Sequence, residues 1–318
     1  MSIAFTFPGQ GSQQIGMGKA LADEFDAARE VFAEVDDALG QKLSELMWSG
    51  DAEELQLTAN AQPALMAVSL AAIRALEAEG VDVAHDVAFV AGHSLGEYSA
   101  LAAARSFEIG KAARLLRIRG DAMQAAVPVG QGAMAAIIGL DQDRVEGICR
   151  DASGSDGGCQ IANDNGGGQL VISGAKGAVE VAMEECKEAG AKRTLPLPVS
   201  APFHSGLMQP AADRMAEALA ESPPKAPIVP LVANVTAAPT TDADEILSML
   251  VDQVTGRVRW RESVERLAAD GVGTLVEVGA GKVLTGLARR IARDVEGMTC
   301  GTPDEVRAVA ERVRGAST

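Results

Sequence analysis

The pattern of apolar and polar positions changes along the chain and predicts elements of different kinds. Apolar residues at every second position over 3–7 predict a first strand, which ends at the loop PGQGSQ. Helical periodicity follows over residues 18–39 and 63–79. A short apolar run at 87–91 predicts a buried strand, and helical spacing returns over 109–126. Strands alternating with helices in this way indicate an α/β fold.

The elements become shorter between residues 127 and 198. They predict, in order, a strand, a helix, two strands, a helix and a strand: GAMAAIIGL, QDRVEGICRDA, CQIAND, QLVISG, AVEVAMEECKEAG and KRTLPLP. This βαββαβ order is that of the split βαβ, or ferredoxin-like, arrangement. We therefore expect a ferredoxin-like subdomain at 127–198, inserted into a large α/β domain formed by 1–126 and 199–318.

The longer α/β pattern resumes after residue 198. IVPLVANV and TLVEVG predict strands, and helices are expected at 243–254, around 262–270 and over the basic stretch VLTGLARRIARD.

Composition and charge narrow the class of function. The net charge of −16 and the pI of about 4.7 argue against nucleic acid or an anionic membrane surface as a partner. No uninterrupted apolar segment reaches the roughly eighteen residues of a membrane span, and no basic leader precedes the first strand. Four scattered cysteines suit reduced thiols, and three histidines argue against a multi-histidine metal centre. We expect a cytoplasmic protein.

The stretch AGHSLGEYSA places Ser94 in the spacing G-x-S-x-G. A predicted strand at 87–91 precedes it, and a helix-forming stretch with Glu97 in its first turn follows. Strand, tight turn and helix are the context of a nucleophile elbow, which lifts the serine hydroxyl clear of the sheet. The alternative is a glycine-rich turn whose serine only caps the helix.

A serine hydroxyl needs a neighbouring base before it can act as a nucleophile, and the chain offers three histidines. His93 adjoins Ser94, and its side chain should diverge and support the turn. His85 precedes the strand in a polar loop, where we expect it to be solvated. His204, in LPVSAPFHSGLM, lies where the inserted unit returns to the large domain and can face the cleft between them. Its alternative is an ordinary surface-loop histidine.

A tetrahedral intermediate at Ser94 would need hydrogen-bond donors for its oxyanion. The N–H of Leu95, directly after the serine, is one expected donor. Gln10, in the loop FPGQGSQ at the end of the first strand, offers a second. The alternative for that loop is a purely structural turn, eased by its glycines.

Arg119 lies on the apolar face of the helix predicted at 109–126. Its neighbours on that face are Ala112, Leu115, Leu116, Ile118 and Met123, whereas Arg114 and Arg117 fall on the opposite, polar face. An arginine that points inward must meet an anion, because burying it unpaired costs several kcal/mol or more. The anion is either an internal carboxylate or the carboxylate of a substrate.

Five motifs together resemble one known family. FPGQGSQ, AGHSLGE, RGDAMQ followed by GAMAAIIGL, PVSAPFHSGLM and EVGAGKVLTGL occur in the order found in the malonyl-CoA:acyl carrier protein transacylases of fatty-acid synthesis. The resemblance extends to about Ile291. It implies that the large domain is α/β-hydrolase-like with a parallel sheet, and that the ferredoxin-like unit is inserted in it.

The resemblance also implies roles for individual residues. Ser94 matches the acylated nucleophile and His204 its base. Gln10 and Leu95 match the residues whose backbone amides form the oxyanion hole. Gln253 matches the residue whose main-chain carbonyl orients the histidine in place of a triad acid.

The remaining residues implied by the resemblance bind the acyl group. Arg119 matches the clamp for the malonyl carboxylate. Phe203 matches a position whose bulk disfavours an α-methyl group, and we expect Met123 and His93 to line the same substrate site. The reaction implied moves malonyl from malonyl-CoA to the phosphopantetheine thiol of acyl carrier protein, without metal or redox cofactor, and we expect a monomer.

Carrier proteins of this kind are acidic, so docking needs local positive charge on an acidic enzyme. The candidate clusters are Lys192 with Arg193, and Arg289 with Arg290 and Arg293.

Two rival functions remain open at the level of sequence. A serine hydrolase of the α/β type shares the elbow, but it usually carries its histidine after the last strand. Here two further strand candidates follow His204. A non-catalytic binding protein with a vestigial site is the other rival, and intact serine, histidine and arginine positions argue against it.

Overall fold

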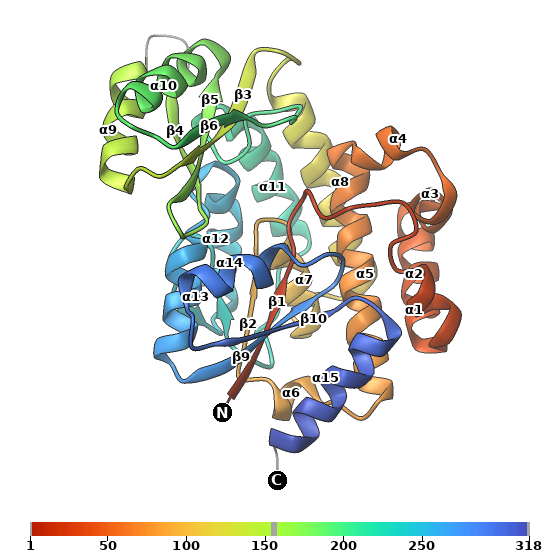
Figure 1. Ribbon diagram of the computed structural model, residues 1–318. Helices are drawn as coiled ribbons and strands as arrows, with labels where there is room; N and C mark the ends of the chain where they lie inside the picture. Colours follow the sequence, from red (N-terminus) through yellow and green to blue (C-terminus); the bar gives the residue numbers. More distant parts are fainter. Residues whose placement is uncertain (1, 154–157, 317–318) are drawn as a thin grey trace.

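The structure, a computed structural model, describes residues 2–153 and 158–316 (Figure 1). Its strands form two separate sheets, one of six strands and one of four. In Figure 1 the four-stranded sheet and its two helices lie together at one end of the molecule, and both chain termini lie at the other end.

The six-stranded sheet A forms the centre of the large α/β part. Its order is β10 (Glu296–Cys300), β9 (Val272–Val278), β1 (Ser2–Phe7), β2 (Phe89–Gly92), β7 (Leu231–Val232) and β8 (Pro239–Thr240). The first five strands are parallel, as predicted, whereas β8 pairs antiparallel with β7 at the edge. Strand β1, the first strand predicted, lies between β9 and β2 and is almost wholly buried.

Both faces of sheet A are covered because alternate side chains of β1 enter different cores. Ile3, Phe5 and Phe7 pack in the larger core with the helices α5 (Thr58–Ala78), α7 (Gly96–Ala103) and α8 (Ile109–Ala126). Ala4 faces a second core, built mainly with α13 (Trp260–Ala269) and α14 (Val283–Ile291). The result is a sheet between two helical layers.

Sheet B has the ferredoxin-like topology expected from the short elements. Its strands are β3 (Gly132–Ile138), β4 (Cys159–Asp164), β5 (Gln169–Ala175) and β6 (Arg193–Pro196), with α9 (Gln142–Ala152) and α10 (Lys176–Glu188) between them. They pair antiparallel in the order β4-β5-β3-β6. This sheet and its helices have a hydrophobic core of their own. The domain boundaries at 126/127 and 198/199 stay a prediction.

Several helices differ from those expected. The predicted helix at 18–39 is two helices, α1 (Lys19–Glu24) and α2 (Asp26–Leu39), because Phe25 is extended (φ −115°, ψ 115°). Helix α5 begins at Thr58 and holds Pro63 inside, although proline usually marks the first turn. The remaining helices are α3 (Leu43–Ser49), α4 (Ala52–Gln56), α6 (Val83–Asp86), η1 (Gly206–Met208), α11 (Gln209–Glu221), α12 (Ala243–Thr255) and α15 (Pro303–Ala316).

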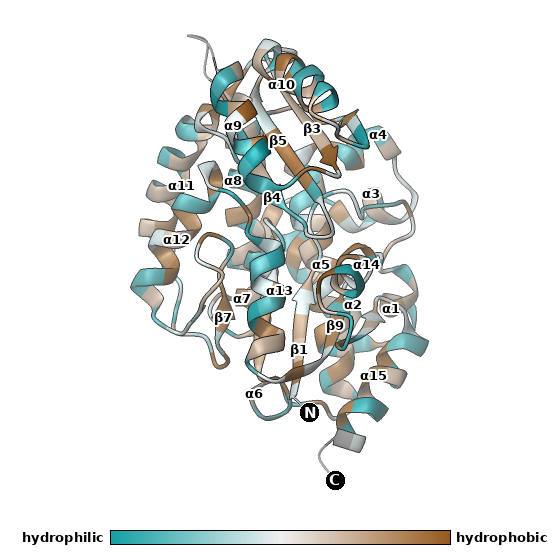
Figure 2. Ribbon diagram, turned by 60° about the vertical axis from the view of Figure 1, so that its left-hand side comes forward, coloured by the Kyte–Doolittle hydropathy of each residue, from teal (hydrophilic) through white to brown (hydrophobic). Residues whose placement is uncertain are grey.

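The outer helices are amphipathic, as their periodicity predicts. In Figure 2, α11 and α12 alternate between teal and brown along their length, which places polar and apolar residues on different faces. Among the described helices, none is long and apolar enough to cross a membrane.

Candidate active site

Ser94 sits in a sharp turn between β2 and α7, the context in which G-x-S-x-G forms an elbow. Its φ of 55° lies in the left-handed region, which costs free energy for a residue with a side chain. The two glycines permit the turn. A Cβ on Gly92 would lie 1.9 Å from the carbonyl carbon of Gly96, and one on Gly96 would lie 2.2 Å from the carbonyl oxygen of Phe7.

Ser94 and His204 are joined by a hydrogen bond of 2.7 Å between Oγ and Nε2. On the other side of the imidazole ring, Nδ1 lies 2.8 Å from the carbonyl oxygen of Gln253 and 3.1 Å from that of Gly256. Carbonyl oxygens only accept, so Nδ1 must carry the proton and Nε2 presents its lone pair to the serine hydroxyl.

The imidazole of His204 is uncharged near neutral pH. The residue is 3% exposed. Burial, followed by the nearby charge of Arg119, lowers the pKa of His204 to about 3. His204 is therefore available as a proton acceptor, and it has main-chain carbonyls where other serine sites use a carboxylate.

Arg119 reaches the serine from α8 and is 1% exposed. Its Nη1 donates to Gln62 Oε1 at 2.7 Å. Its Nη2 donates to Gln253 Oε1 at 2.9 Å and to Ser94 Oγ at 3.2 Å. Within the described part of the chain, no carboxylate oxygen lies within 4.0 Å of this guanidinium. The internal ion pair that the sequence left open is thus not formed.

A buried polar network supports the serine from behind. Gln253 Nε2 donates to the Ser94 carbonyl oxygen at 2.9 Å and to Glu97 Oε2 at 2.5 Å. Asn234 Oδ1 accepts from the Ser94 N–H at 2.8 Å, and its Nδ2 donates to the Gly92 carbonyl at 2.6 Å. Burial raises the pKa of Glu97 to about 7. The elbow is thus held on both sides of its strained residue.

These residues meet in a pocket of about 420 Å³ between the two sheets. Eight of the nine residues that the sequence analysis assigned to the site line it: Gln10, His93, Ser94, Leu95, Arg119, Met123, Phe203 and His204. The ninth, Gln253, is fully buried behind Arg119 and His204. Met134 of β3 and Asn163 of β4 close the pocket from the side of sheet B.

The two expected oxyanion donors, Gln10 and Leu95, lie on the same side of the pocket as Ser94. The N–H of Ser94 is already bonded to Asn234. The Leu95 N–H follows it at the start of α7 and makes no hydrogen bond to another described residue. The Gln10 side chain is anchored, because its Oε1 accepts from the Thr58 hydroxyl at 2.9 Å.

The other predicted residues shape the walls. His93 supports the turn, since its Nε2 lies 2.9 Å from Asn165 Oδ1 and its ring packs at 5.6 Å against Trp260. Phe203 is half-buried at the junction of the large core and a small cluster beneath sheet B. Met123 is buried beside Gln62, with its Sδ 3.8 Å from Nε2 of that residue.

His85 lies outside the site. Its side chain is 81% exposed and its Nδ1 lies 2.7 Å from Asp82 Oδ2, which agrees with the solvated loop predicted. Of the two arginines expected on the polar face of α8, Arg114 is exposed. Arg117 is half-buried, and it donates to Asn60 at 2.9 Å and to Gln41 at 2.5 Å.

Sequence reasoning missed four buried side chains of the site, namely Gln62, Glu97, Asn165 and Asn234. Gln62 lay outside the helix expected to begin at Pro63. Glu97 was interpreted only as a favourable first-turn charge, although it is 1% exposed. A carboxylate directly inside a nucleophile elbow, followed by apolar residues, was a signal that could have indicated burial. The two asparagines carried no signal in the sequence.

Comparison with known proteins agrees with this arrangement of fold and site. Residues 4–307 match the family described as the acyl transferase domain. The malonyl CoA-acyl carrier protein transacylase of Escherichia coli is 47% identical over 309 residues, 97% of this chain and 99% of that protein.

Two solved structures are similar over nearly the whole chain. The acyl-carrier-protein-S-malonyltransferase of Bartonella henselae has a TM-score of 0.96 and 61% identity, covering 99% of this chain and 100% of that one. A malonyl-transacylase in complex with its type II polyketide synthase acyl carrier protein has a TM-score of 0.94 and 42% identity, covering 97–100% of the two chains at 98% and 100%. The chain belongs to the malonyl CoA-acyl carrier protein transacylase family of acyl transferases. These relatives have transacylase names, not hydrolase names.

Proposed function

We propose that the protein transfers a malonyl group from malonyl-CoA to the phosphopantetheine thiol of acyl carrier protein, for fatty-acid synthesis. The group passes through an ester on Ser94, so the two substrates react in turn. The assignment of these substrates draws on the names of the relatives. The intermediate draws on the contacts of the serine.

In the first half-reaction the Ser94 oxygen attacks the thioester carbonyl while His204 Nε2 takes its proton. The 2.7 Å contact is already within the range for this transfer. The imidazolium that forms keeps its Nδ1–H on the carbonyls of Gln253 and Gly256. Collapse of the tetrahedral intermediate breaks the C–S bond, and His204 returns the proton to the departing CoA sulfur.

The oxyanion of that intermediate is the charge that must be stabilised. The backbone N–H groups of Leu95 and Gln10 are the proposed donors, and a donor of this kind typically contributes about 3–4 kcal/mol. The second half-reaction runs the same steps with the carrier thiol as nucleophile and Ser94 as leaving group. No metal or redox step is needed, and the absence of a cofactor stays a prediction.

Arg119 is the observation that carries the choice of malonyl. A guanidinium that is 1% exposed and has no carboxylate partner in the described residues retains an unmet demand for an anion. It points at Ser94 Oγ from 3.2 Å, so an anion bound there would lie beside the acylated oxygen. Malonyl carries a terminal carboxylate at a suitable distance from its thioester, and acetyl carries none.

The test is intact-protein mass after brief mixing with malonyl-CoA. The wild type should gain one malonyl group, and Ser94→Ala should gain none. His204→Ala should acylate about a hundred- to ten-thousand-fold more slowly, as expected for loss of a general base. His85→Ala, at an exposed histidine, is the control and should acylate at the wild-type rate. Labelling of Ser94→Ala would contradict the proposed intermediate.

A further inference from the structure

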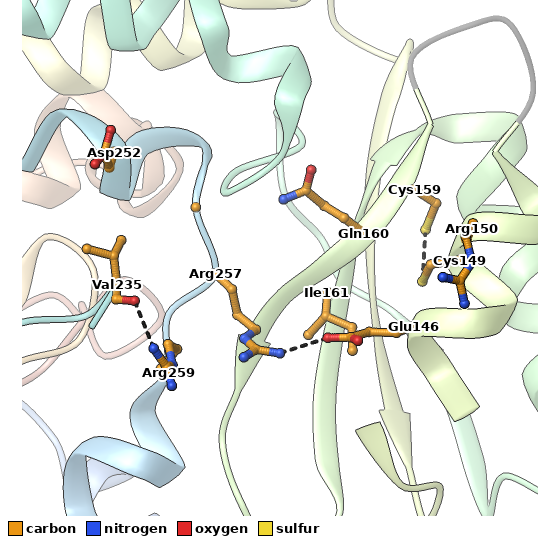
Figure 3. Close-up of a pocket in the computed structure, with 11 residues that line it drawn as sticks. Glu146, Cys149, Arg150, Cys159, Gln160, Ile161, Val235, Asp252, Arg257 and Arg259 are labelled. Atoms are coloured by element: carbon orange, nitrogen blue, oxygen red, sulfur yellow. Dashed lines mark hydrogen bonds and ion pairs between the residues drawn. The ribbon is translucent and has the colours of Figure 1, made fainter. Parts of the chain in front are cut away.

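A second cleft, of about 580 Å³, lies behind His204 on the side away from the substrate pocket. Figure 3 shows it between β4 and α9 of the ferredoxin-like part and the loop that follows α12. Its arginines are neutralised within the protein, since Arg257 pairs with Glu146 at 2.9 Å and Arg259 pairs with Glu262. The residue in this cleft with unusual contacts is Gln160 of β4.

The side-chain amide of Gln160 uses both its ends to bind main chain around His204. Its Nε2 donates to the carbonyl oxygen of His204 itself at 3.2 Å and to that of Thr255 at 3.0 Å. Its Oε1 accepts from the N–H of Gly206 at 3.1 Å. One side chain from sheet B thus joins the loop that carries the histidine to the end of α12.

Both of these segments need such support. His204 has a φ of 56°, in the left-handed region, and such a conformation persists only where the surroundings hold it. Thr255 is the last residue of α12, so its carbonyl has no partner within the helix. Its neighbours in the chain, Gln253 and Gly256, provide the carbonyls that orient the imidazole.

We propose that Gln160 is a positioning residue that holds His204 in register with Ser94. By fixing the main chain at residues 204, 206 and 255, it keeps the imidazole and the carbonyls behind it in one geometry. Gln160 does not line the substrate pocket, so it acts through His204 and not on the acyl group. The inference rests on the proposed function only in using malonyl transfer as its readout.

The experiment measures single-turnover formation of malonyl-enzyme over a range of malonyl-CoA concentrations. Gln160→Leu has a similar size and loses all three hydrogen bonds. Its maximal acylation rate should fall at least tenfold, while the half-saturating malonyl-CoA concentration changes less than threefold. A serine-directed fluorophosphonate, which needs no malonyl site, should likewise label Ser94 at least fivefold more slowly. Gln142→Leu, on α9 of the same subdomain, loses a bond only to Glu146 and is the matched control.

A second variant keeps the test decisive if Gln160→Leu does not fold. Gln160→Glu retains an acceptor for Gly206 but replaces the donor by an acceptor facing the carbonyls of His204 and Thr255. It should slow acylation at least fivefold near pH 8. Wild-type rates in the folded variant, or a weaker half-saturation with an unchanged maximal rate, would overturn the proposal. If the wild type itself forms no malonyl-enzyme, the proposed function fails, and the fluorophosphonate rates still decide the role of Gln160.

Discussion

Arg119 makes a quantitative prediction about selectivity. In a buried site, a charge-assisted hydrogen bond contributes about 1.5–3 kcal/mol. A fork that bonds both oxygens of a malonyl carboxylate could therefore favour malonyl over acetyl by roughly a hundredfold or more. Arg119→Ala should lower kcat/KM for malonyl-CoA strongly, while kcat/KM for acetyl-CoA falls less or rises, because the unpaired buried cation is gone.

Two variants control that measurement. Arg119→Lys should restore the malonyl rate only in part, since an ammonium group cannot form the planar fork. Arg114→Ala removes an exposed arginine from the same helix and should change neither rate. Arg117 is less suitable as a control, because it bonds to Asn60 and Gln41. An equal loss for both substrates in Arg119→Ala would make Arg119 a structural residue.

At the scale of single residues, the sequence predicted those that face the pocket better than those that stand behind it. Ser94 and Arg119 could be found because each breaks a local rule, one by lying in a glycine-flanked turn and the other by lying on an apolar helix face. Asn234 and Gln160 follow ordinary local patterns. Their importance arises from contacts to Ser94 and His204 across long stretches of chain, which no local pattern encodes.

At the scale of elements, the elbow between β2 and α7 depends on how closely its backbone segments approach. A methyl group on Gly96 would lie 2.2 Å from the Phe7 carbonyl oxygen, which belongs to the central strand and cannot move freely. Gly96→Ala should destabilise the protein by at least about 1–3 kcal/mol, the usual range for overpacking. It should also lower the rate of malonyl-enzyme formation. Urea unfolding and the acylation assay measure the two effects.

The matched control is a glycine with room around it. In Gly147, within α9, an added Cβ would meet its nearest atom at 3.9 Å. Gly147→Ala should therefore stabilise the protein by about 0.5–1 kcal/mol, because alanine loses less backbone freedom in a helix. An unfolding free energy for Gly96→Ala equal to that of the wild type would mean that the elbow tolerates a side chain there.

Elements with strong periodicity were predicted almost to the residue, and those set by tertiary contacts were not. Helices α8 and α9 begin and end where the pattern placed them. The break at Phe25 has no glycine or proline to announce it, and Phe25 packs against the large core. Helix α11 was not predicted, although it contacts α8 and α12 and buries Met215 and Leu219. Strand β7 is only two residues long because its predicted stretch turns away from the sheet.

At the scale of the whole molecule, the charge of the chain bears on how an acidic carrier protein can approach. A net charge of −16 repels such a partner at long range, but salt screens exposed charges beyond a Debye length of about 8–10 Å. Local positive charge can then decide docking. The two basic clusters predicted from the sequence are exposed, and they flank the turn between β4 and β5.

Neighbouring glycines place the two clusters together. The side chain of Lys192 passes over Gly139, where an added Cβ would meet its Cγ at 2.7 Å. Arg290 lies over Gly167 in the β4–β5 turn, at 3.2 Å from such a Cβ, and Gly168 of the same turn approaches Gly139. Lys192 with Arg193 and Arg289 with Arg290 and Arg293 therefore form one surface, which we call the basic surface.

We predict that the carrier protein docks on the basic surface. The double variant Lys192→Glu with Arg193→Glu, and likewise Arg289→Glu with Arg290→Glu, should raise the KM for carrier protein at least tenfold. Malonyl-enzyme formation from malonyl-CoA should stay within about twofold of the wild type, because neither cluster lines the substrate pocket. Lys19→Glu with Arg29→Glu, on α1 and α2 away from sheet B (Figure 1), makes the same change in net charge and is the control. If all three double variants raise the KM equally, the effect is long-range repulsion and not docking. If neither cluster variant raises it, the carrier docks elsewhere.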